Sequence, residues 1–183
     1  MTILHIDSSI NGDNSASRAI SRSILDQVRA QSPGSRVISR DLVAQPLPHL
    51  TLASFNDQEV LDEFLGADTI VIGAPMYNFT LPTQLKAWLD RILIAGKTFR
   101  YTAEGPEGLA KGKRVVVALA RGGIYDVGSP AAALEHLETY LRGVFNFIGI
   151  EPEFVAADGL NISPEQREMS IRQALGQSVR LAA

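Results

Sequence analysis

Clustered hydroxyl and amide side chains follow the first apolar segment of the chain. These polar residues are Ser8, Ser9, Asn11, Asn14, Ser15 and Ser17. They lead into a stretch from Ala16 onward that has the apolar spacing of a helix. Hydroxyls and free backbone N–H groups at a helix start, where the positive end of the dipole lies, suit a phosphate dianion. An ordinary helix cap at Ser15 or Asn14 explains the same residues equally well, so this loop alone leaves both interpretations open.

A second cluster combines aromatic, thioether and amide side chains just after an apolar run. It reads Pro75-Met76-Tyr77-Asn78-Phe79. A flavin ring needs an apolar surface beside it and hydrogen-bonding groups, often from the backbone, at its polar edge. Each aromatic residue taken singly is better explained by core packing. Their clustering in a loop, outside the strand, favours a binding role.

Two adjacent glycines form a third candidate feature, in Arg121-Gly122-Gly123. Glycine permits positive φ and close approach of the backbone to a flat ligand, although a plain turn is the default interpretation. The three clusters could serve a phosphate, a ring edge and a ring face, which together describe one mononucleotide site. The sequence has neither Gly-x-Gly-x-x-Gly nor Gly-Lys-Ser/Thr, which argues against a dinucleotide Rossmann site and a P-loop.

The clusters must be brought together by the elements that precede them. Five short apolar segments predict strands at Thr2–Asp7, Arg36–Asp41, Thr69–Ala74, Arg114–Ala120 and Glu153–Ala157. Helical spacing predicts helices over 16–30, from Asn56 or Asp57 to 65, from Pro82 to Gly96, over 130–147, and from Pro164 after a Ser163 cap. The segment 97–112 is expected to be a loop.

Alternating strands and helices predict an α/β fold with one parallel sheet and helices on both faces. The expected strand order is 2-1-3-4-5, and the ligand crevice is expected at the carboxyl ends of the strands. The loops after the first, third and fourth strands are those that carry the three clusters. A chain of 183 residues without a visible boundary is expected to form a single domain, residues 1–183.

Composition excludes several classes of function. A net charge of −3 without a basic run offers little to nucleic acid or to an anionic membrane. There are no cysteines, which removes disulfides and thiolate chemistry and suits a cytoplasmic location, as does an amino terminus without a secretory leader. His5, His49 and His136 lack metal-ligand spacing, so no metal is expected. Gly-x-Ser-x-Gly is absent, which makes serine hydrolysis improbable.

The motifs taken together resemble one known family. They are Ser8-Ser9-Ile10 with Ser15-x-Ser17, Ala74 to Phe79 with Thr83-Gln84-Leu85-Lys86, Thr98-Phe99-Arg100-Tyr101-Thr102 with Gly105 to Leu109, and Arg121-Gly122-Gly123. In this order, over nearly the whole chain, they resemble the bacterial FMN-dependent NADH-azoreductases, which also act as NAD(P)H:quinone oxidoreductases. The resemblance implies a flavodoxin-like three-layer sandwich. It also implies a homodimer with bound FMN near the interface and each active site completed by the neighbouring chain.

The resemblance also implies roles for individual residues. Ser9, Ser15 and Ser17 would hold the phosphate, Met76, Tyr77, Asn78 and Phe79 would meet the ring, and Arg121, Gly122 and Gly123 would line its pyrimidine side. Ala16, Pro75 and Ala120 complete the expected cofactor-binding set. Tyr101 and Phe147 would border the substrate space. The implied reaction is ping-pong: hydride passes from NADH or NADPH to the flavin, and a quinone or azo compound is then reduced by two electrons.

The sequence departs from the family pattern at two places, and two other functions are alternatives to the oxidoreductase. Family members often carry Ser or Thr where this chain has Ala120, and the connection 42–54 is shorter than in many relatives, so the flavin contacts and substrate range there are open. The main alternative is a flavodoxin-type electron carrier without NAD(P)H oxidase activity of its own. A regulatory or binding module that has lost its flavin is a third possibility.

Overall fold

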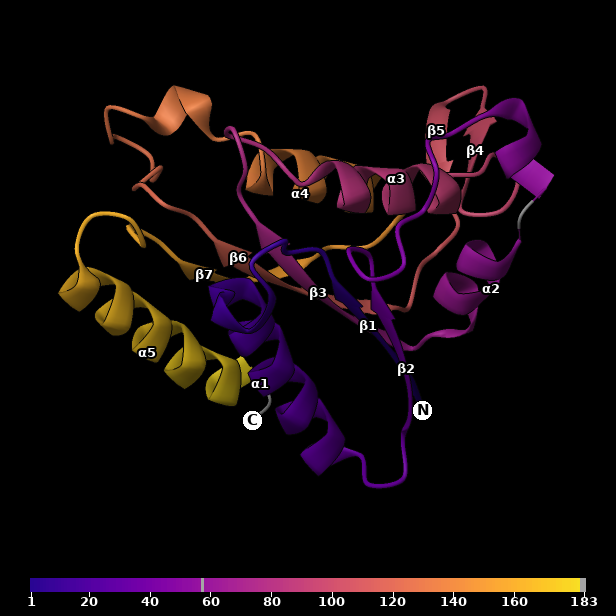
Figure 1. The fold of residues 1–183 in the computed structure, drawn as a ribbon. Helices are drawn as coiled ribbons and strands as arrows, with labels where there is room; N and C mark the ends of the chain where they lie inside the picture. The colour runs from indigo at the N-terminus through magenta and orange to yellow at the C-terminus, as the bar shows by residue number, and fades with distance from the viewer. Residues whose placement is uncertain (57, 182–183) are drawn as a thin grey trace.

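A five-stranded parallel sheet forms the centre of the molecule. The structure is a computed structural model that describes residues 1–56 and 58–181. The strands lie in the order β2-β1-β3-β6-β7 (Figure 1). Their bounds are β1 Thr2–Asp7, β2 Arg36–Asp41, β3 Thr69–Pro75, β6 Arg114–Ala120 and β7 Glu153–Ala157. This order matches the expected 2-1-3-4-5 when the two strands of a separate hairpin are left out of the numbering.

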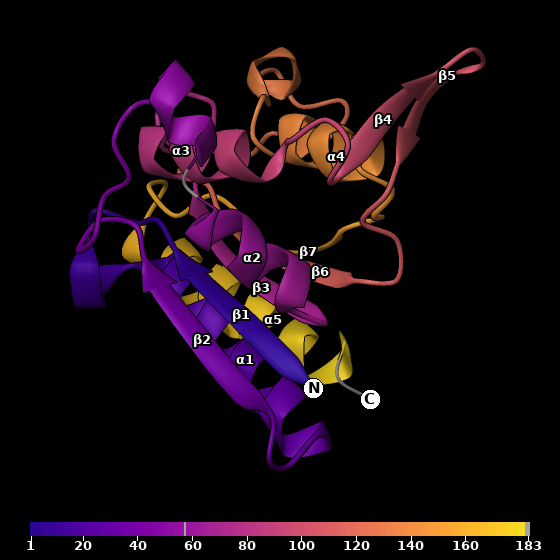
Figure 2. The ribbon, with the colours of Figure 1, turned by 90° about the vertical axis from the view of Figure 1, so that its right-hand side faces the viewer.

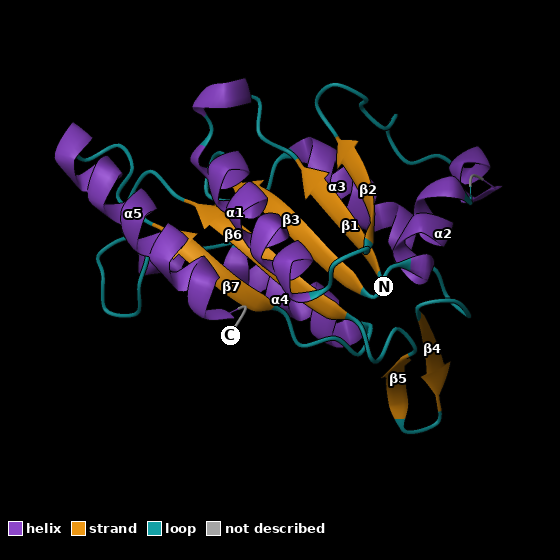
Figure 3. Cartoon of the chain, turned by 90° about the horizontal axis from the view of Figure 1, so that it is seen from below, coloured by secondary structure: helices purple, strands orange, loops and turns teal. Residues whose placement is uncertain are grey.

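Helices cover both faces of the sheet, giving three layers. On one face lie α1 (Ala16–Gln31) and α5 (Pro164–Leu181), and on the other lie α2 (Glu59–Gly66), α3 (Thr83–Ile92) and α4 (Glu138–Phe147); Figures 1 and 3 show both layers. Alternate residues of β3 point to opposite faces, because side chains alternate along a strand. Val71 belongs to the core that lies under α1 and α5, while Ile70 and Ile72 belong to the opposite core. Burial on both faces explains why β3 is a continuous apolar run.

The larger core lies under α2, α3 and α4. Trp88 of α3 is fully buried, and its ring meets Phe64 of α2 edge to face with centroids 6.1 Å apart. Leu85 and Leu89 of α3 add to the same cluster. The apolar residues spaced three and four apart in the sequence therefore form the buried face of α3, as expected.

The expected continuation of α3 to Gly96 is wrong. Pro82 is the N-cap rather than the first helical residue, and the helix ends at Ile92. The hydroxyl of Thr98 donates to the carbonyl of Ile92 over 2.6 Å, and the Thr98 amide donates to the carbonyl of Ile94. The returning chain thus satisfies carbonyls that a longer helix would have used.

The expected single helix over 130–147 is also wrong. A short 3-10 turn, Ala132–Leu134, is followed by α4, which begins only at Glu138. The carboxylate of Glu135 accepts hydrogen bonds from the backbone N–H groups of Leu137, Glu138 and Thr139. Because the Glu135 side chain caps these first N–H groups, α4 begins at Glu138. At α2, Asp57 lies outside the described residues, Asn56 ends a 3-10 turn, and Gln58 is the N-cap.

The segment expected to be a loop, 97–112, contains an antiparallel hairpin. Its strands are β4 (Phe99–Thr102) and β5 (Gly105–Gly108), and Figure 2 shows it projecting from the body. Arg100 faces Glu107 across the pair, with Nη2 2.7 Å from the carboxylate. The expectation missed this hairpin because the segment's glycines and charges resemble a loop, whereas cross-strand pairing supplies its order. No helix in the described part of the chain combines the length and apolar character needed to cross a membrane.

Gly108 controls how the hairpin meets α4. A Cβ at this position would lie 2.2 Å from the backbone nitrogen of Gly149 and 2.5 Å from the carbonyl oxygen of Ile148. Gly108→Ala is therefore expected to lower the free energy of unfolding by about 1–3 kcal/mol, because backbone atoms must shift. Gly66→Ala is the matched control, since nothing lies within 4 Å of its Cβ position and alanine favours the helix. Urea unfolding measures both; equal stability of the two variants would contradict the assignment.

Candidate mononucleotide-binding site

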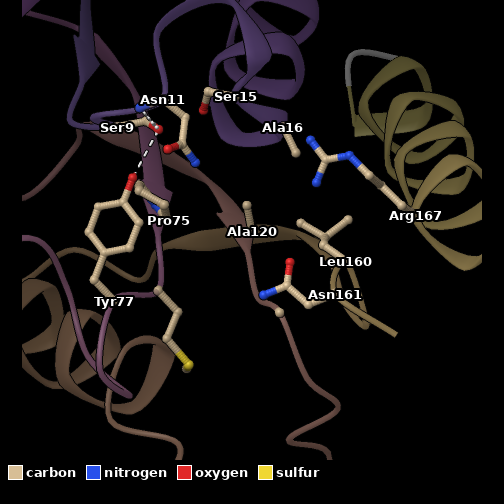
Figure 4. Close-up of a pocket in the computed structure, with 12 residues that line it drawn as sticks. Ser9, Asn11, Ser15, Ala16, Pro75, Tyr77, Ala120, Leu160, Asn161 and Arg167 are labelled. Atoms are coloured by element: carbon tan, nitrogen blue, oxygen red, sulfur yellow. Dashed lines mark hydrogen bonds between the residues drawn. The ribbon is translucent and has the colours of Figure 1, made fainter. Parts of the chain in front are cut away.

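A polar cavity of about 150 Å³ lies at the carboxyl edge of the sheet. Figure 4 shows the side chains around it. Its lining residues are Ser9, Asn11, Ser15, Ala16, Pro75, Met76, Tyr77, Ala120, Gly122, Leu160, Asn161 and Arg167. The structure thus brings together the three loops singled out from the sequence. It adds a fourth loop and a side chain from α5.

The loop after β1 presents hydroxyls and the start of α1. Ser15 is the N-cap of α1, and its Oγ accepts a hydrogen bond from the backbone N–H of Arg18. Ser17 is fully buried and does not line the cavity, and its Oγ lies 3.1 Å from Ser15 Oγ. Ser9, Ser15 and Ala16 therefore face the cavity, while the hydroxyl of Ser17 supports Ser15. Ser15 therefore caps the helix and also lines the polar cavity, while its contact with a phosphate stays a prediction.

Arg18 anchors the loop after β1 from outside the cavity. Its guanidinium forms two hydrogen bonds with the Asp41 carboxylate, at 2.7 and 2.9 Å. It also donates from Nε and Nη2 to the carbonyl oxygen of Ser9, at 3.3 and 2.9 Å. Arg18 does not line the cavity. Its charge is paired with the Asp41 carboxylate, and its hydrogen bonds to the Ser9 carbonyl fix the position of Ser9.

The loop after β3 has an unusual backbone. Asn78 and Phe79 both have positive φ, 48° and 71°. They occupy a tight turn in which Tyr77 and Thr80 exchange backbone hydrogen bonds of 2.9 and 3.2 Å. Positive φ is tolerated by Asn but costs energy for Phe. Such strain persists where the surroundings impose it and often marks a functional loop.

Tyr77 ties this turn to the loop after β1. Its hydroxyl lies 3.1 Å from Ser9 Oγ and accepts a hydrogen bond of the same length from the backbone N–H of Ile10. Tyr77 also lines a second, more apolar cavity of about 600 Å³. The residues of that cavity are Ile10, Met76, Tyr77, Asn78, Thr80, Leu81, Pro82, Thr83 and Gln84. Met76 and Tyr77 are common to both cavities, so the polar and apolar spaces adjoin.

The loop after β6 lines the polar cavity with small residues and not with the side chain of Arg121. Ala120 and Gly122 line the polar cavity, but Arg121 is 4% exposed and turns away from it. Its guanidinium pairs with Asp158 at 2.6 Å and with Glu138 at 3.4 Å. Arg121 therefore joins the ends of β6 and β7 to the start of α4. Arg121 is not among the residues that line either cavity, so its place in the site stays a prediction.

Three lining residues, Leu160, Asn161 and Arg167, were missed from the sequence. Leu160 and Asn161 follow β7, which runs parallel to β6, so the carboxyl end of β7 reaches the same edge. Asn161 N–H donates to the carbonyl of Gly122 over 3.0 Å. A Cβ at Gly122 would meet Asn161 Nδ2 at 2.5 Å, so glycine lets the two loops lie together. The loop after the last strand could have been included on topology alone.

Tyr101 and Phe147 do not line either cavity within the chain. Tyr101 sits on the hairpin and is 75% exposed. Phe99 lies between them, with its ring centroid 5.6 Å from Tyr101 and 4.7 Å from Phe147. Phe147 also lines an apolar groove of about 360 Å³ with Leu93, Thr139, Tyr140, Gly143 and Val144. The two expected substrate-pocket residues thus form a separate aromatic cluster.

The sheet order and the polar loops at its carboxyl edge define the flavodoxin-like class. A family model described as flavodoxin-like fold matches residues 1–181. The FMN-dependent NADH:quinone oxidoreductase 2 of Bradyrhizobium diazoefficiens is 52% identical over 201 aligned positions that cover all of both chains. The FMN-dependent NADH:quinone oxidoreductase of Xanthomonas campestris is 50% identical, over 97% of each chain. This chain belongs to the same flavodoxin-like family as these enzymes.

Solved structures agree with this relationship. The azoreductase of Bacillus anthracis strain Sterne superposes with a TM-score of 0.91 at 28% identity, covering 100% of this chain and 98% of the other. An FMN-dependent NADH-azoreductase from Bacillus anthracis, determined in complex with FMN, gives a TM-score of 0.84 at 26% identity over 100% of both chains. The resemblance seen in the sequence motifs is therefore confirmed.

The Arg18–Asp41 pair predicts a pH dependence of stability. The hydrogen bond from Arg18, aided by the N–H groups of Val43 and Ala44, lowers the pKa of Asp41 to about 2. Because the folded pKa lies below the ordinary value of 3.8, the pair stabilises the fold above pH 4, and this stability is lost as the pH falls toward 2. Asp41→Asn should cost about 1 kcal/mol near neutral pH, since Asp41 is 36% exposed.

Chemical unfolding of wild type and Asp41→Asn between pH 2 and 7 measures this effect. The difference in unfolding free energy should shrink below pH 4. Asp62→Asn, which alters an exposed carboxylate on α2, controls for the loss of one surface charge. A difference for Asp41→Asn that stays constant down to pH 2 would contradict the pairing.

Proposed function

We propose that this chain is an FMN-dependent oxidoreductase that transfers hydride from NADH or NADPH to quinones and azo compounds. The observation that carries the proposal is the convergence of four loops on a polar cavity that adjoins an apolar one. Relatives that share about half of the sequence over the full length carry the corresponding enzyme name. These relationships favour an enzyme over a flavodoxin-type electron carrier.

The residues of the site fit FMN at both ends. Ser9, Ser15 and the backbone N–H groups of Ala16 and Ser17 would hold the phosphate, because the first amides of a helix have no partner within it. Asn11 extends the same polar wall. When bound, FMN supplies the chemistry, accepting hydride from the nicotinamide and delivering two electrons to the acceptor.

The ring end of the site would be built mainly from backbone. Pro75 to Phe79 would border the ring, and Asn78 of the strained turn lines the apolar cavity. Ala120 and the main chain of Arg121, Gly122 and Gly123 would line the pyrimidine side. Since position 120 lacks a hydroxyl, only its main chain can form hydrogen bonds there. The protein's contribution is to position the ring and exclude water.

We further propose a single FMN-binding domain, residues 1–183, that acts as a homodimer in the cytoplasm. The cysteine-free sequence supports the location. Exposed Tyr101 and the apolar groove beside Phe147 support the dimer, since exposed apolar patches mark interaction surfaces. Neither residue borders the polar cavity or the adjoining apolar cavity of its own chain, so both would serve the substrate space of the partner subunit. Each active site would then be complete only in the dimer.

A direct assay tests the proposed reaction. The purified protein with FMN should oxidise NADH or NADPH steadily when a naphthoquinone is supplied and no other reductase is present. Absorbance at the nicotinamide band measures turnover, and the visible spectrum before and after anaerobic addition of NADH reports flavin reduction. A flavin that stays oxidised under NADH, but is reduced by a separate reductase, would identify an electron carrier instead.

Tyr101→Ala tests the contribution of the hairpin. This variant should lower kcat/KM for quinones while FMN remains bound, because Tyr101 lies outside the cofactor cavity of its own chain. Met169→Ala, which removes an exposed apolar side chain from α5, is the comparison. The flavin-to-protein absorbance ratio is measured together with turnover, and sedimentation should give a dimer at micromolar concentration. Loss of flavin from Tyr101→Ala, or a wild-type monomer, would contradict this assignment.

A further inference from the structure

Arg167 of α5 is a cation of the polar cavity that the sequence motifs did not identify. Of the residues that line this cavity in the described part of the chain, Arg167 alone carries a positive charge. Its side chain extends from α5 toward the start of α1 (Figure 4). Nη2 donates to the carbonyl oxygen of Asn14 over 3.0 Å, one residue before the N-cap Ser15. The guanidinium therefore lies beside the hydroxyls and amides of the phosphate end.

The guanidinium of Arg167 is available to a ligand, in contrast to the two other arginines near the site. Arg18 is paired with Asp41, and Arg121 is paired with Asp158. Among the described residues, no carboxylate forms an ion pair with Arg167, and its hydrogen bond to Asn14 uses one of five N–H donors. The remaining donors are free to meet an anion.

Local structure fixes where Arg167 projects. Ser163 caps α5 by accepting from the N–H of Gln166, and Pro164 is the first helical residue. One turn further along α5, the hydroxyl of Ser170 donates to the carbonyl of Asp158 over 2.7 Å, which ties the helix to the end of β7. The first turn of α5 is thus anchored on both sides of Arg167. A long side chain placed this way loses less freedom on binding than one on a mobile segment.

We infer that Arg167 binds the phosphate group of the flavin nucleotide and makes the site selective for FMN over riboflavin. This inference rests on the proposed function. A phosphate monoester carries more than one negative charge near pH 7. Serine hydroxyls and helix amides supply only neutral donors, whereas a guanidinium adds a full charge and can bind two oxygens at once. Arg167 would bind the phosphate from a position beside the start of α1.

Titration of the flavin-free protein with FMN and with riboflavin tests this role. Arg167→Gln should weaken FMN binding by about ten- to a hundredfold, the loss expected for a hydrogen-bonded charge, and leave riboflavin binding unchanged. Arg167→Lys should recover part of the FMN affinity. Arg172→Gln is the matched control, because Arg172 lies on the same helix and pairs with exposed Glu168. Quenching of flavin fluorescence gives each dissociation constant, and repeating the titration in salt should show a weaker salt dependence for Arg167→Gln.

Each outcome decides the inference. Unchanged FMN affinity in Arg167→Gln would overturn it, and so would an equal loss for FMN and riboflavin, which would indicate a structural effect on α5. In both cases wild-type binding of FMN and oxidation of NADH would leave the proposed function intact. A wild-type protein that binds neither flavin would overturn the proposed function and this inference together.

Discussion

Parallel pairing of β1, β3, β6 and β7 is the constraint on which the rest of the structure depends. Because the strands run in the same direction, every loop that follows a strand emerges at one edge, and residues far apart in the sequence meet there. The apolar runs that form β3 and β6 are buried on both faces, so the register of these strands is fixed by two cores at once. The position of the site follows from that register.

The loops at this edge are held from outside the cavity. Arg18 donates a hydrogen bond to the carbonyl of Ser9 and forms an ion pair with Asp41. Arg121 joins the ends of β6 and β7 through its ion pair with Asp158. Arg121 is buried and Arg18 is partly buried, and both charges are paired, so these arginines serve the structure of the loops. Tyr77 links the first two loops by hydrogen bonds, leaving the inner wall to hydroxyls, amides and backbone. The cavity therefore has a neutral lining with one free cation, in the part of the chain that the structure describes, at Arg167.

The two aromatic side chains expected to border the substrate space lie away from this cavity. Tyr101 is exposed on the hairpin, and Phe147 of α4 borders an apolar groove. Gly108 permits the hairpin to approach the turn after α4 closely enough for Phe99 to bridge the two aromatics. A fold that places the flavin site and an aromatic cluster on different parts of its surface can unite them by pairing two copies, which is the arrangement proposed for the active site.

The sequence by itself determined the five strands, the sheet order, the cap of α1 and most of the cavity lining from Ser9 to Gly122. These features depend on local periodicity and on the topology of parallel sheets, both of which can be read along the chain. Only the tertiary structure decided that Arg18 and Arg121 turn away from the cavity, that Arg167 and Asn161 enter it, and that residues 99–108 pair as a hairpin. The positions of the polar side chains depend on which distant partner each one meets, and linear spacing does not show such partners. The hairpin depends on cross-strand pairing in a segment whose glycines and charges resemble a loop.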